Sequence, residues 1–487
     1  MKTDILALEP ALLWKNFKHI CDIPHPSKKE KQIVEWVQQF AKKNELQFKT
    51  DEVGNTVIIK SATKGMENRQ TLVLQAHLDM VPQKNSGVVH DFDKDPIRPY
   101  ADGGWVKATD TTLGADNGIG AAAMLAVLED QSLIHGPIEA LFTIDEETGL
   151  TGAFGLKPGF ITGKLMINTD TEEDGHFCIG CAGGINTNGV LKFNREKITG
   201  QYLFYRVSIK GLKGGHSGAD IHLYRGNALK LMNRFLWNAA RIADVRIVSV
   251  DGGNVRNAIP RESFATIAFF ESREKEVKNW VNKFASEVKN EYAIAEPDFT
   301  IALEPAQSSD VIDMLSQQKL FNILYSLPNG VIRMSDEIKG VVETSTNLSV
   351  VRTHDGYFEI QSLTRSSMES GKQDVINSIQ SVYDLAGSGA AAIHEGSYPG
   401  WKPNPHSPLL AEAKKVYSSL FGAEPVIEVV HAGLECGIIG SIFPGMDMIS
   451  FGPTIKYPHS PDEKVEIATV KKFWDLLLNI LREAPEK

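Results

Sequence analysis

The sequence has few cysteines, and their number and positions exclude a disulfide framework. Its 487 residues include four of them, Cys21, Cys178, Cys181 and Cys436. Cysteines this few and this scattered are typical of a reducing compartment, so we expect a cytoplasmic protein. Cys178 and Cys181 form a CxxC pair. Because no second pair lies at zinc-site spacing, we interpret these two as ordinary half-buried thiols.

Long apolar runs and an excess of basic residues are also lacking. No stretch approaches the length of a membrane span, and the N-terminal residues mix acids, a proline and polar positions, unlike a signal peptide. The net charge is -10, from 51 Lys and Arg against 61 Asp and Glu. This balance makes nucleic acid and membrane surfaces improbable partners, which leaves a soluble enzyme or binding protein.

The length of the chain predicts at least two domains, because one hydrophobic core seldom supports so many residues. Short, nearly continuous apolar strands at 56–60, 71–76, 138–144 and 165–168 alternate with helical segments such as 119–129. This order is typical of an α/β domain with a largely parallel sheet, and functional sites of such domains lie at strand ends.

The character of the sequence changes after residue 180. Strands at 201–209 and 264–270 alternate apolar with polar residues, as half-buried antiparallel strands do. A similar order of strands and helices recurs over 299–386, and 395–408 is rich in Gly and Pro like a linker. We therefore predict an α/β domain from 1–184 and 398–487, interrupted by an inserted α+β domain, 185–397, of two related halves.

Three carboxylates, Asp145, Glu146 and Glu147, directly follow the apolar strand 138–144. Neighbouring acids at the end of a buried strand repel one another, so either water solvates them or a bound cation offsets the repulsion. Adjacent side chains diverge, which allows one glutamate to bind a metal while the other reaches a bound water. Asp145 is interpreted as a helper that hydrogen-bonds the loop.

Other predicted strand or helix ends offer similar ligands. His77 ends the strand 71–76, and Asp79 is placed to orient its ring through the second nitrogen. The others are Asp116, Asp170 and His459. Taken singly, each has an ordinary interpretation, such as a helix cap for Asp116 or an exposed loop residue for His459. As a set, they predict a metal site.

These blocks resemble the M20 (aminoacylase-1-like) metallopeptidases. The stretches most similar to its aminoacyl-histidine dipeptidase branch, also called Xaa-His dipeptidase, peptidase D or bacterial carnosinase, are HLDMVPQ, LGADNGIG, DEETGLTGA, GLKGGHSGADI and HAGLECG. The resemblance covers essentially the whole chain and implies the two-domain M20 fold, in which the α/β domain is the catalytic, metal-binding domain and the inserted domain is a lid. Asn117, where many relatives carry a second acid, agrees with this branch.

The resemblance implies two metal sites that share one carboxylate. One would consist of His77, Asp116 and Asp170, and the other of Asp116, Glu147 and His459. Zn²⁺ is the expected metal, and the same ligands would accept Co²⁺ or Mn²⁺. The resemblance also implies a cis peptide between Asp116 and Asn117.

It further implies that Glu146 is the general base, that Asp79 orients His77, and that His216 stabilises charge on the reacting carbonyl. His216 lies in GGHSG, whose glycines suit a group brought in by lid closure. The ordinary interpretation of His216 is a loop histidine in a turn.

A dipeptidase must bind both substrate termini. We expect Glu435 to bind the amine, and Asn257 and Arg365 to bind the carboxylate, although ordinary hydrogen bonding and surface charge would also explain them. A preference for C-terminal histidine comes from the resemblance alone, and His431 could contact that ring.

The expected function is therefore zinc-dependent hydrolysis of dipeptides, preferring Xaa-His, by a cytoplasmic homodimer. One alternative is a tripeptidase, carboxypeptidase or N-acyl amino acid amidohydrolase with the same mechanism. The other is a metal-binding protein without catalysis, which would have no use for Glu146.

Overall fold

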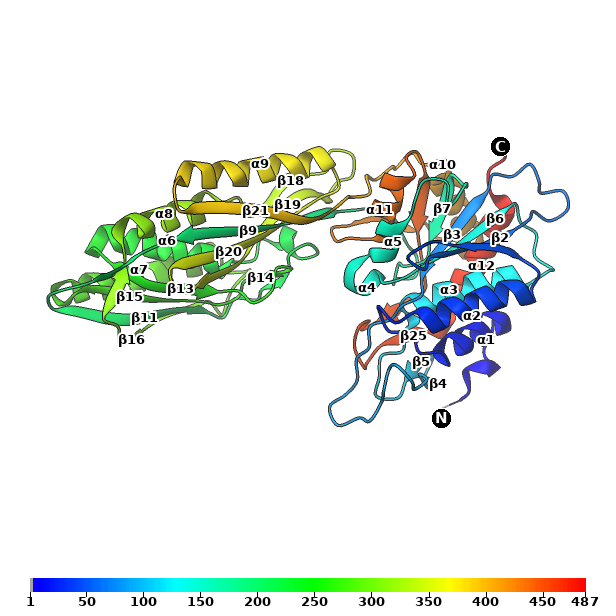
Figure 1. The fold of residues 1–487 in the computed structure, drawn as a ribbon, viewed down its shortest axis with the longest axis horizontal. Helices are drawn as coiled ribbons and strands as arrows, with labels where there is room; N and C mark the ends of the chain where they lie inside the picture. The colour runs from blue at the N-terminus through cyan, green and yellow to red at the C-terminus, as the bar shows by residue number, and fades with distance from the viewer. Residues whose placement is uncertain (1–2) are drawn as a thin grey trace. The chain divides into compact units, whose positions relative to one another are not determined.

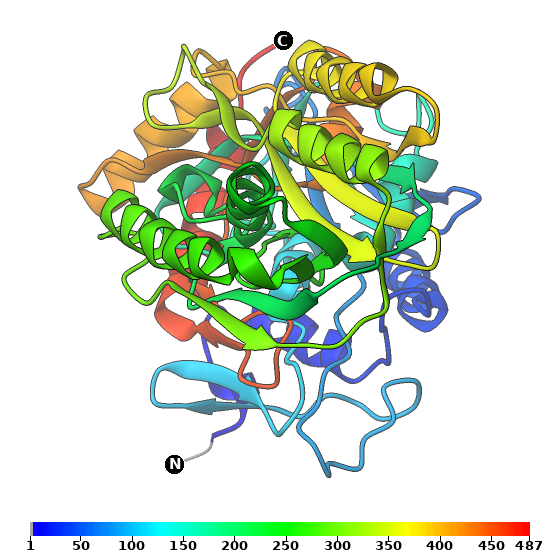
Figure 2. The same ribbon diagram turned by 90° about the vertical axis from the view of Figure 1, so that its left-hand side faces the viewer.

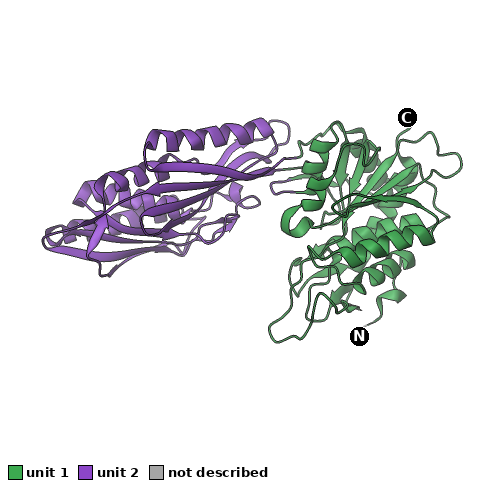
Figure 3. Cartoon of the chain, in the orientation of Figure 1, with its two compact units in different colours: residues 1–181, 401–429, 434–487 green, residues 182–400, 430–433 purple. Residues whose placement is uncertain are grey.

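The computed structural model describes residues 3–487, which form two compact units (Figure 3). Unit 1 contains the chain up to Cys181 together with Trp401–Val429 and Leu434–Lys487. Unit 2 contains Ala182–Gly400 and the short segment Val430–Gly433, which the sequence assigned to the catalytic part. The chain therefore passes between the units four times.

Unit 1 is built on an eight-stranded sheet in the order β1-β2-β6-β3-β7-β23-β8-β22 (Figure 1). Its four central strands run parallel to one another. They are β6 (Ile138–Thr143), β3 (Leu72–His77), β7 (Leu165–Asn168) and β23 (Asp447–Ser450). The first three are buried along their whole length, as their continuous apolar sequences predict. Their carboxyl ends meet at one edge, where sites of α/β folds lie.

Antiparallel strands complete this sheet, and helices cover it. The outer strands are β1 (Gln47–Thr50), β2 (Thr56–Lys60), β8 (His176–Cys181) and β22 (Val426–Val430). The helices are α1 (Ala11–Cys21), α2 (Lys31–Lys43), α3 (Ala115–Glu129), α4 (Glu146–Gly149), α5 (Thr151–Gly155), α10 (Pro408–Phe421), α11 (Glu435–Ile442) and α12 (Ile467–Glu483). The interior helix α3 packs on both α1 and β3. A Cβ at Gly118 would lie 3.1 Å from the ring of Phe17, so glycine permits the close approach of α1.

Two sequence predictions in unit 1 are wrong. The predicted loop before residue 114 contains the hairpin β4 (Pro99–Asp102) and β5 (Trp105–Ala108). This hairpin joins β24 (Ile455–Lys456) and β25 (Lys464–Glu466) in a small sheet. Strands of two to four residues are too short for an alternation of apolar and polar residues to be recognised in the sequence. Cys178 and Cys181 are fully buried rather than half-buried.

Unit 2 contains a nine-stranded sheet in the order β16-β11-β15-β13-β19-β20-β9-β21, with β18 also paired to β19. Its strands are β9 (Gly183–Lys192), β11 (Tyr202–Lys210), β13 (Arg246–Gly252), β15 (Ser263–Phe270), β16 (Thr300–Pro305), β18 (Gly330–Met334), β19 (Val342–Thr353), β20 (Tyr357–Ser366) and β21 (Ala390–Tyr398). Every recorded pair in this sheet is antiparallel. The two predicted halves thus share one sheet, in which β16 of the second half pairs with β11 of the first and β19 pairs with β13.

Four helices form one hydrophobic core with this sheet (Figures 1 and 2). They are α6 (Ala228–Ala243), α7 (Glu274–Glu291), α8 (Met314–Ser326) and α9 (Glu369–Ala386). Two small pairs stand outside the sheet, β10 (Arg195–Lys197) with β17 (Asp310–Ile312), and β12 (Gly215–His216) with β14 (Ala258–Ile259). The predicted linker 395–408 is wrong at its start, because β21 pairs with β9 as far as Tyr398.

None of the helices within residues 3–487 combines the length and apolar character needed to cross a membrane.

Candidate metal centre and active site

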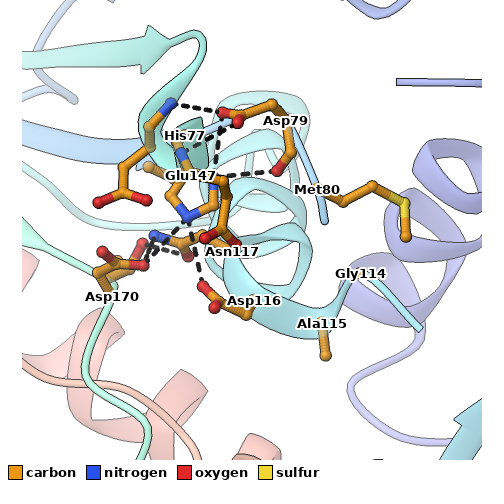
Figure 4. A network of polar contacts seen from close by, with 12 residues as sticks. His77, Asp79, Met80, Gly114, Ala115, Asp116, Asn117, Glu147 and Asp170 are labelled. Atoms are coloured by element: carbon orange, nitrogen blue, oxygen red, sulfur yellow. Dashed lines mark hydrogen bonds and ion pairs between the residues drawn. The ribbon is translucent and has the colours of Figure 1, made fainter. Parts of the chain in front are cut away.

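His77 lies at the carboxyl end of β3 and is 1% exposed. Its Nε2 is 3.3 Å from Asp116 Oδ1 and 3.3 Å from Asp170 Oδ1 (Figure 4). Its Nδ1 lies 3.0 Å from the backbone carbonyl of Asp79 and donates a hydrogen bond to it. Burial alone would lower the pKa of His77, but Asp170, Asp116 and Asp79 raise it well above the ordinary value. Nε2 therefore faces two carboxylates, as a metal ligand would.

Asp116 also faces a second histidine. The Nε2 atom of His459 is 3.1 Å from Asp116 Oδ2 and 2.9 Å from Glu147 Oε2. One oxygen of Asp116 thus points toward each histidine. Within the trio His77, Asp116 and Asp170, and within the trio Asp116, Glu147 and His459, the candidate ligand atoms lie within 4.8 Å of one another. Asp116 is common to both trios.

The donor atoms of this cluster fit two divalent cations. Glu147 Oε1 is buried and has no hydrogen-bond partner among the described residues. Burial raises the pKa of both Glu147 and Asp170, because a carboxylate without compensation is costly inside a protein. Carboxylate oxygens and imidazole nitrogens suit Zn²⁺, and they also accept Co²⁺ or Mn²⁺.

The start of α3 determines where Asp116 and Asp170 lie. The peptide bond between Asp116 and Asn117 is cis, which confirms the expectation from the resemblance. Asn117 Nδ2 donates to Asp170 Oδ1 over 2.9 Å, and Asn117 Oδ1 accepts from the Thr169 hydroxyl at 3.2 Å. The neutral amide of Asn117 therefore holds Asp170 in place by donating to it. An ionised carboxylate at this position has no hydrogen to donate and would repel Asp170.

Glu463 supports the same turn and was missed in the sequence. Its buried carboxylate accepts four backbone N–H groups at 2.7 to 3.3 Å, from Leu113, Gly114, Ala115 and Asp116. Burial raises the pKa of Glu463 to about 7, while these N–H groups lower it. No local pattern reveals this role, because about 350 residues separate the carboxylate from the turn. Its position four residues after His459 was the one available signal.

Asp79 has a wider role than the predicted orientation of His77. Its carboxylate accepts the backbone N–H of Glu146 at 3.0 Å and of Glu147 at 3.2 Å, and the Ser27 hydroxyl at 2.8 Å. The distance from Asp79 Oδ1 to His77 Nδ1 is 3.4 Å, longer than the contact to the Asp79 carbonyl. The carboxylate of Asp79 thus mainly positions the two neighbouring glutamates.

The three neighbouring acids do not extend the strand, because β6 ends at Thr143. Asp145 has a left-handed backbone with φ of 49°, and Glu146 and Glu147 begin α4. The carboxylate of Asp145 accepts the hydroxyls of Thr148 and of Thr151, the latter at 2.6 Å, which confirms its role in the loop.

Glu146 is the remaining acid of this group. Burial, together with the negative charges of Asp170, Glu435 and Glu147, raises the pKa of Glu146 well above its ordinary value, and His77 opposes this effect. A carboxylate with a raised pKa binds a proton more readily, which suits a general base.

Glu435 begins α11, a helix that the sequence did not predict. Its Oε2 accepts from Gln75 Nε2 and from the Thr143 hydroxyl, both at 2.7 Å, whereas its buried Oε1 has no partner among the described residues. Burial raises the pKa of Glu435 to about 7. Gln75 Oε1 accepts from Asn168 Nδ2 at 2.6 Å. The sequence pattern did not predict this buried network of side-chain hydrogen bonds across β3, β6 and β7, because Gln75 lies within an apolar strand.

The remaining predicted site residues lie in unit 2. Both metal trios consist of residues of unit 1 alone. His216 is in β12, and the backbone carbonyl of Asn257, directly before β14, accepts the backbone N–H of Ser217 at 2.8 Å. Arg365 in β20 is 5% exposed, and its Nη1 donates to the Tyr398 hydroxyl at 2.9 Å. Arg365 Nε is buried without a partner among the described residues. The charge of Arg365 helps to lower the pKa of His216.

The model of peptidase family M20/M25/M40 matches residues 73–483, and the chain belongs to this family. It is 48% identical over 486 residues to the cytosol non-specific dipeptidase of Escherichia coli strain K12, covering 100% of both chains. The crystal structure of aminoacylhistidine dipeptidase from Vibrio alginolyticus is 47% identical, with a TM-score of 0.96 over 100% of this chain and 99% of that one.

More distant structures share the fold. Aminopeptidase PepT from Bacillus cereus is 16% identical and has a TM-score of 0.62, covering 98% of this chain and 99% of the other. The mixed sheets and the two-unit architecture agree with the predicted M20-type fold.

Proposed function

We propose that the chain is a metal-dependent dipeptidase that prefers Xaa-His substrates. The observation that carries this proposal is the pair of ligand trios sharing Asp116, next to the high-pKa carboxyl of Glu146. The two near relatives are named as dipeptidases, one non-specific and one for aminoacylhistidine substrates. A non-catalytic metal-binding protein would leave Glu146 without a role.

The metal centre would hold two cations, with Zn²⁺ the expected ion. His77, Asp116 and Asp170 would hold one, and Asp116, Glu147 and His459 the other. When bound, the pair supplies Lewis acidity that polarises the scissile carbonyl and lowers the pKa of water toward neutrality.

Glu146 is the proton carrier in this mechanism. Its carboxylate accepts a proton from the attacking water as the oxygen bonds to the peptide carbon, and then delivers this proton to the leaving nitrogen as the C–N bond breaks. Asp79 keeps the residue oriented by accepting its backbone N–H. His77 remains oriented through its Nδ1 contact with the Asp79 carbonyl.

Each unit offers candidate groups for one end of a dipeptide substrate. The unpartnered Oε1 of Glu435 suits the ammonium group of a dipeptide, and the unpartnered Nε of Arg365 suits its carboxylate. Asn257 adds an amide for the same carboxylate, and His216 donates to the oxygen of the scissile carbonyl. His431 Nδ1, also buried and unpartnered among the described residues, is a candidate for the substrate histidine ring.

Unit 2 would then be the lid domain inserted into a catalytic domain, with the division near 184/185 and 397/398. We also propose a homodimer. A cytoplasmic location agrees with the Escherichia coli relative, which is named as a cytosol enzyme.

A substrate panel combined with metal analysis tests this function. We expect about two equivalents of bound zinc, cobalt or manganese per chain, and the fastest hydrolysis on carnosine and other Xaa-His dipeptides. Equal rates on dipeptides lacking histidine would favour the non-specific activity named for the Escherichia coli relative. Hydrolysis confined to tripeptides or N-acetyl amino acids would contradict the proposal and favour another M20 activity.

A further inference from the structure

The turn after His216 controls which ring nitrogen carries the proton. The backbone N–H groups of Gly218 and Ala219 point at Nδ1 of His216, over 3.2 and 3.0 Å. A backbone N–H can only donate, so Nδ1 must offer its lone pair to both groups. In a neutral imidazole the single proton then resides on Nε2.

We propose that His216 is held as a neutral hydrogen-bond donor, protonated on Nε2, and that Asp220 and Arg225 are the positioning residues of its turn. The catalytic meaning of this donor rests on the proposed peptidase function, in which Nε2–H faces the oxygen of the scissile carbonyl. Both ring nitrogens are then committed, so His216 cannot be the general base, and this role stays with Glu146.

Asp220 and Arg225 tie the two ends of the turn together. Asp220 Oδ2 accepts the backbone N–H of His216 at 2.8 Å, and Asp220 Oδ1 lies 3.3 Å from Arg225 Nη2. Arg225 Nη1 donates to the carbonyl of Gly214 at 2.6 Å. Both side chains of the ion pair are largely shielded from solvent, at 30% and 23% exposure, which limits screening of their attraction.

The glycines around His216 are packed against neighbouring groups. Gly215 has φ of 140°, and a Cβ there would lie 2.2 Å from Arg225 Nη1 and 2.6 Å from Asp220 Oδ2. A Cβ on Gly218 would lie 2.0 Å from the carbonyl oxygen of His431. These positions need glycine because the ion pair and the 430–433 segment occupy the space.

The charges around the ring favour its neutral form. Burial and the charge of Arg365 lower the pKa of His216, and Asp220 opposes them. The ring of His431 is neutral near pH 7 and adds no charge, since its own pKa is lowered to about 3. Protonation of Nδ1 would also replace two hydrogen bonds by repulsion from two N–H dipoles. The neutral donor should therefore persist to lower pH than it would in an exposed histidine.

Nitrogen NMR on the full-length, metal-loaded protein tests the tautomer directly. In protein labelled with ¹⁵N-histidine, the His216 signals are identified by their loss in His216→Gln. We expect a protonated Nε2 and a non-protonated Nδ1 at pH 7 and at pH 6. A protonated Nδ1 would overturn the tautomer assignment while leaving the peptidase proposal intact. Absence of dipeptide hydrolysis in a protein with the expected tautomer would overturn the peptidase proposal instead.

Kinetics of variants test the positioning residues. Loss of the donor in His216→Ala should lower kcat by about 10²–10³-fold. Asp220→Ala and Arg225→Ala should lower kcat about tenfold, with a much smaller change in KM, because the donor remains but loses its alignment. Asp220→Asn, which keeps an acceptor for the His216 N–H, should recover most of the rate.

The matched control is Arg273→Ala, which removes another arginine–aspartate pair of unit 2, Arg273 and Asp244 at 3.9 Å, more exposed than the first. Its kcat should equal that of the unaltered protein. If Arg225→Ala, folded by circular dichroism, matches this control in both kcat and the ¹⁵N signals of His216, the positioning role is wrong.

Discussion

The two units bury clusters of ionisable groups of opposite charge type, acidic in unit 1 and basic in unit 2. In unit 1 the metal trios and two further glutamates bring acids together, and the pKa is raised at Glu146, Glu147, Asp170 and Glu435. In unit 2 the corresponding cluster has His216, His431 and Arg365, and the pKa of both histidines is lowered.

Burial has opposite effects on the two clusters because it disfavours the charged form of every group. Burial thus raises the pKa of these four carboxyl groups and lowers that of the two imidazoles, whereas the acids around His77 outweigh burial and raise its pKa. In the proposed function, cations would complete the acidic cluster, and a substrate carboxylate would complete the cluster around Arg365. Metal binding would then belong to unit 1 and carboxylate recognition to unit 2.

The largest expected effect is loss of the shared metal ligand. Asp116→Asn removes a charge that belongs to both trios, so we expect less than one metal per chain and no measurable activity. Asp170→Asn belongs to one trio only and should retain about one metal. Inductively coupled plasma mass spectrometry measures the stoichiometry. Equal metal content in the two variants would contradict the bridging role of Asp116.

Next in size is the loss of the proton carrier. Glu146→Gln should lower kcat by about 10²–10⁴-fold because the amide cannot accept a proton, while two metals remain bound. Stopped-assay kinetics and metal analysis on the same sample check this. Glu428→Gln, which alters a partly exposed acid paired with His176 in unit 1, is the control and should keep full activity. Unchanged hydrolysis by Glu146→Gln would refute the mechanism.

A smaller loss is expected when the orientation of the glutamates changes. Asp79→Asn retains one acceptor but offers it to only one of the two N–H groups of α4, so kcat/KM should fall by about 10–100-fold. Ser27→Ala removes only a hydroxyl from Asp79 and should cost about 1 kcal/mol of stability with little loss of activity. If both variants behave alike, Asp79 does no more than stabilise the fold.

The smallest effect concerns unit 2 and its neutral imidazole. His431 has a pKa of about 3 in the folded chain and about 6.5 unfolded, mainly from burial and then Arg365. At pH 7 it is neutral in the folded chain and mostly neutral in the unfolded chain, so it contributes little pH dependence there. As pH falls from 6.5 toward 3, the unfolded chain binds the proton first, so the free energy of unfolding decreases by at most about 1.4 kcal/mol per pH unit.

Urea unfolding of the unaltered chain and of His431→Gln between pH 7 and pH 5.5 tests this sign. The unaltered chain should lose more stability than the variant over that interval. Parallel losses in the two proteins would mean that His431 is not held neutral by its surroundings.

Local patterns in the sequence predicted most elements of the fold. The continuous apolar strand 165–168 matches β7, and the amphipathic helix 274–291 matches α7. A strand buried on both faces is apolar throughout, whereas a helix buried on one face repeats its apolar residues about every 3.6 positions, so the two patterns can be told apart. The pattern failed over 80–114 and 395–408, where Gly and Pro led us to predict loops but strands lie at β4, β5 and the end of β21. Pairing with distant strands outweighed local propensity there.

The sequence by itself determined which side chains can bind metal, because a metal needs histidine and carboxylate groups and these follow strand ends in recognisable blocks. The tertiary structure decided how they work together. Glu463 binds a turn about 350 residues away, Glu435 joins Gln75 across 360 residues, and the carboxylate of Asp79 holds α4. Hydrogen bonds between distant segments leave no trace in local periodicity, since only the folded chain brings donor and acceptor within 3 Å of one another.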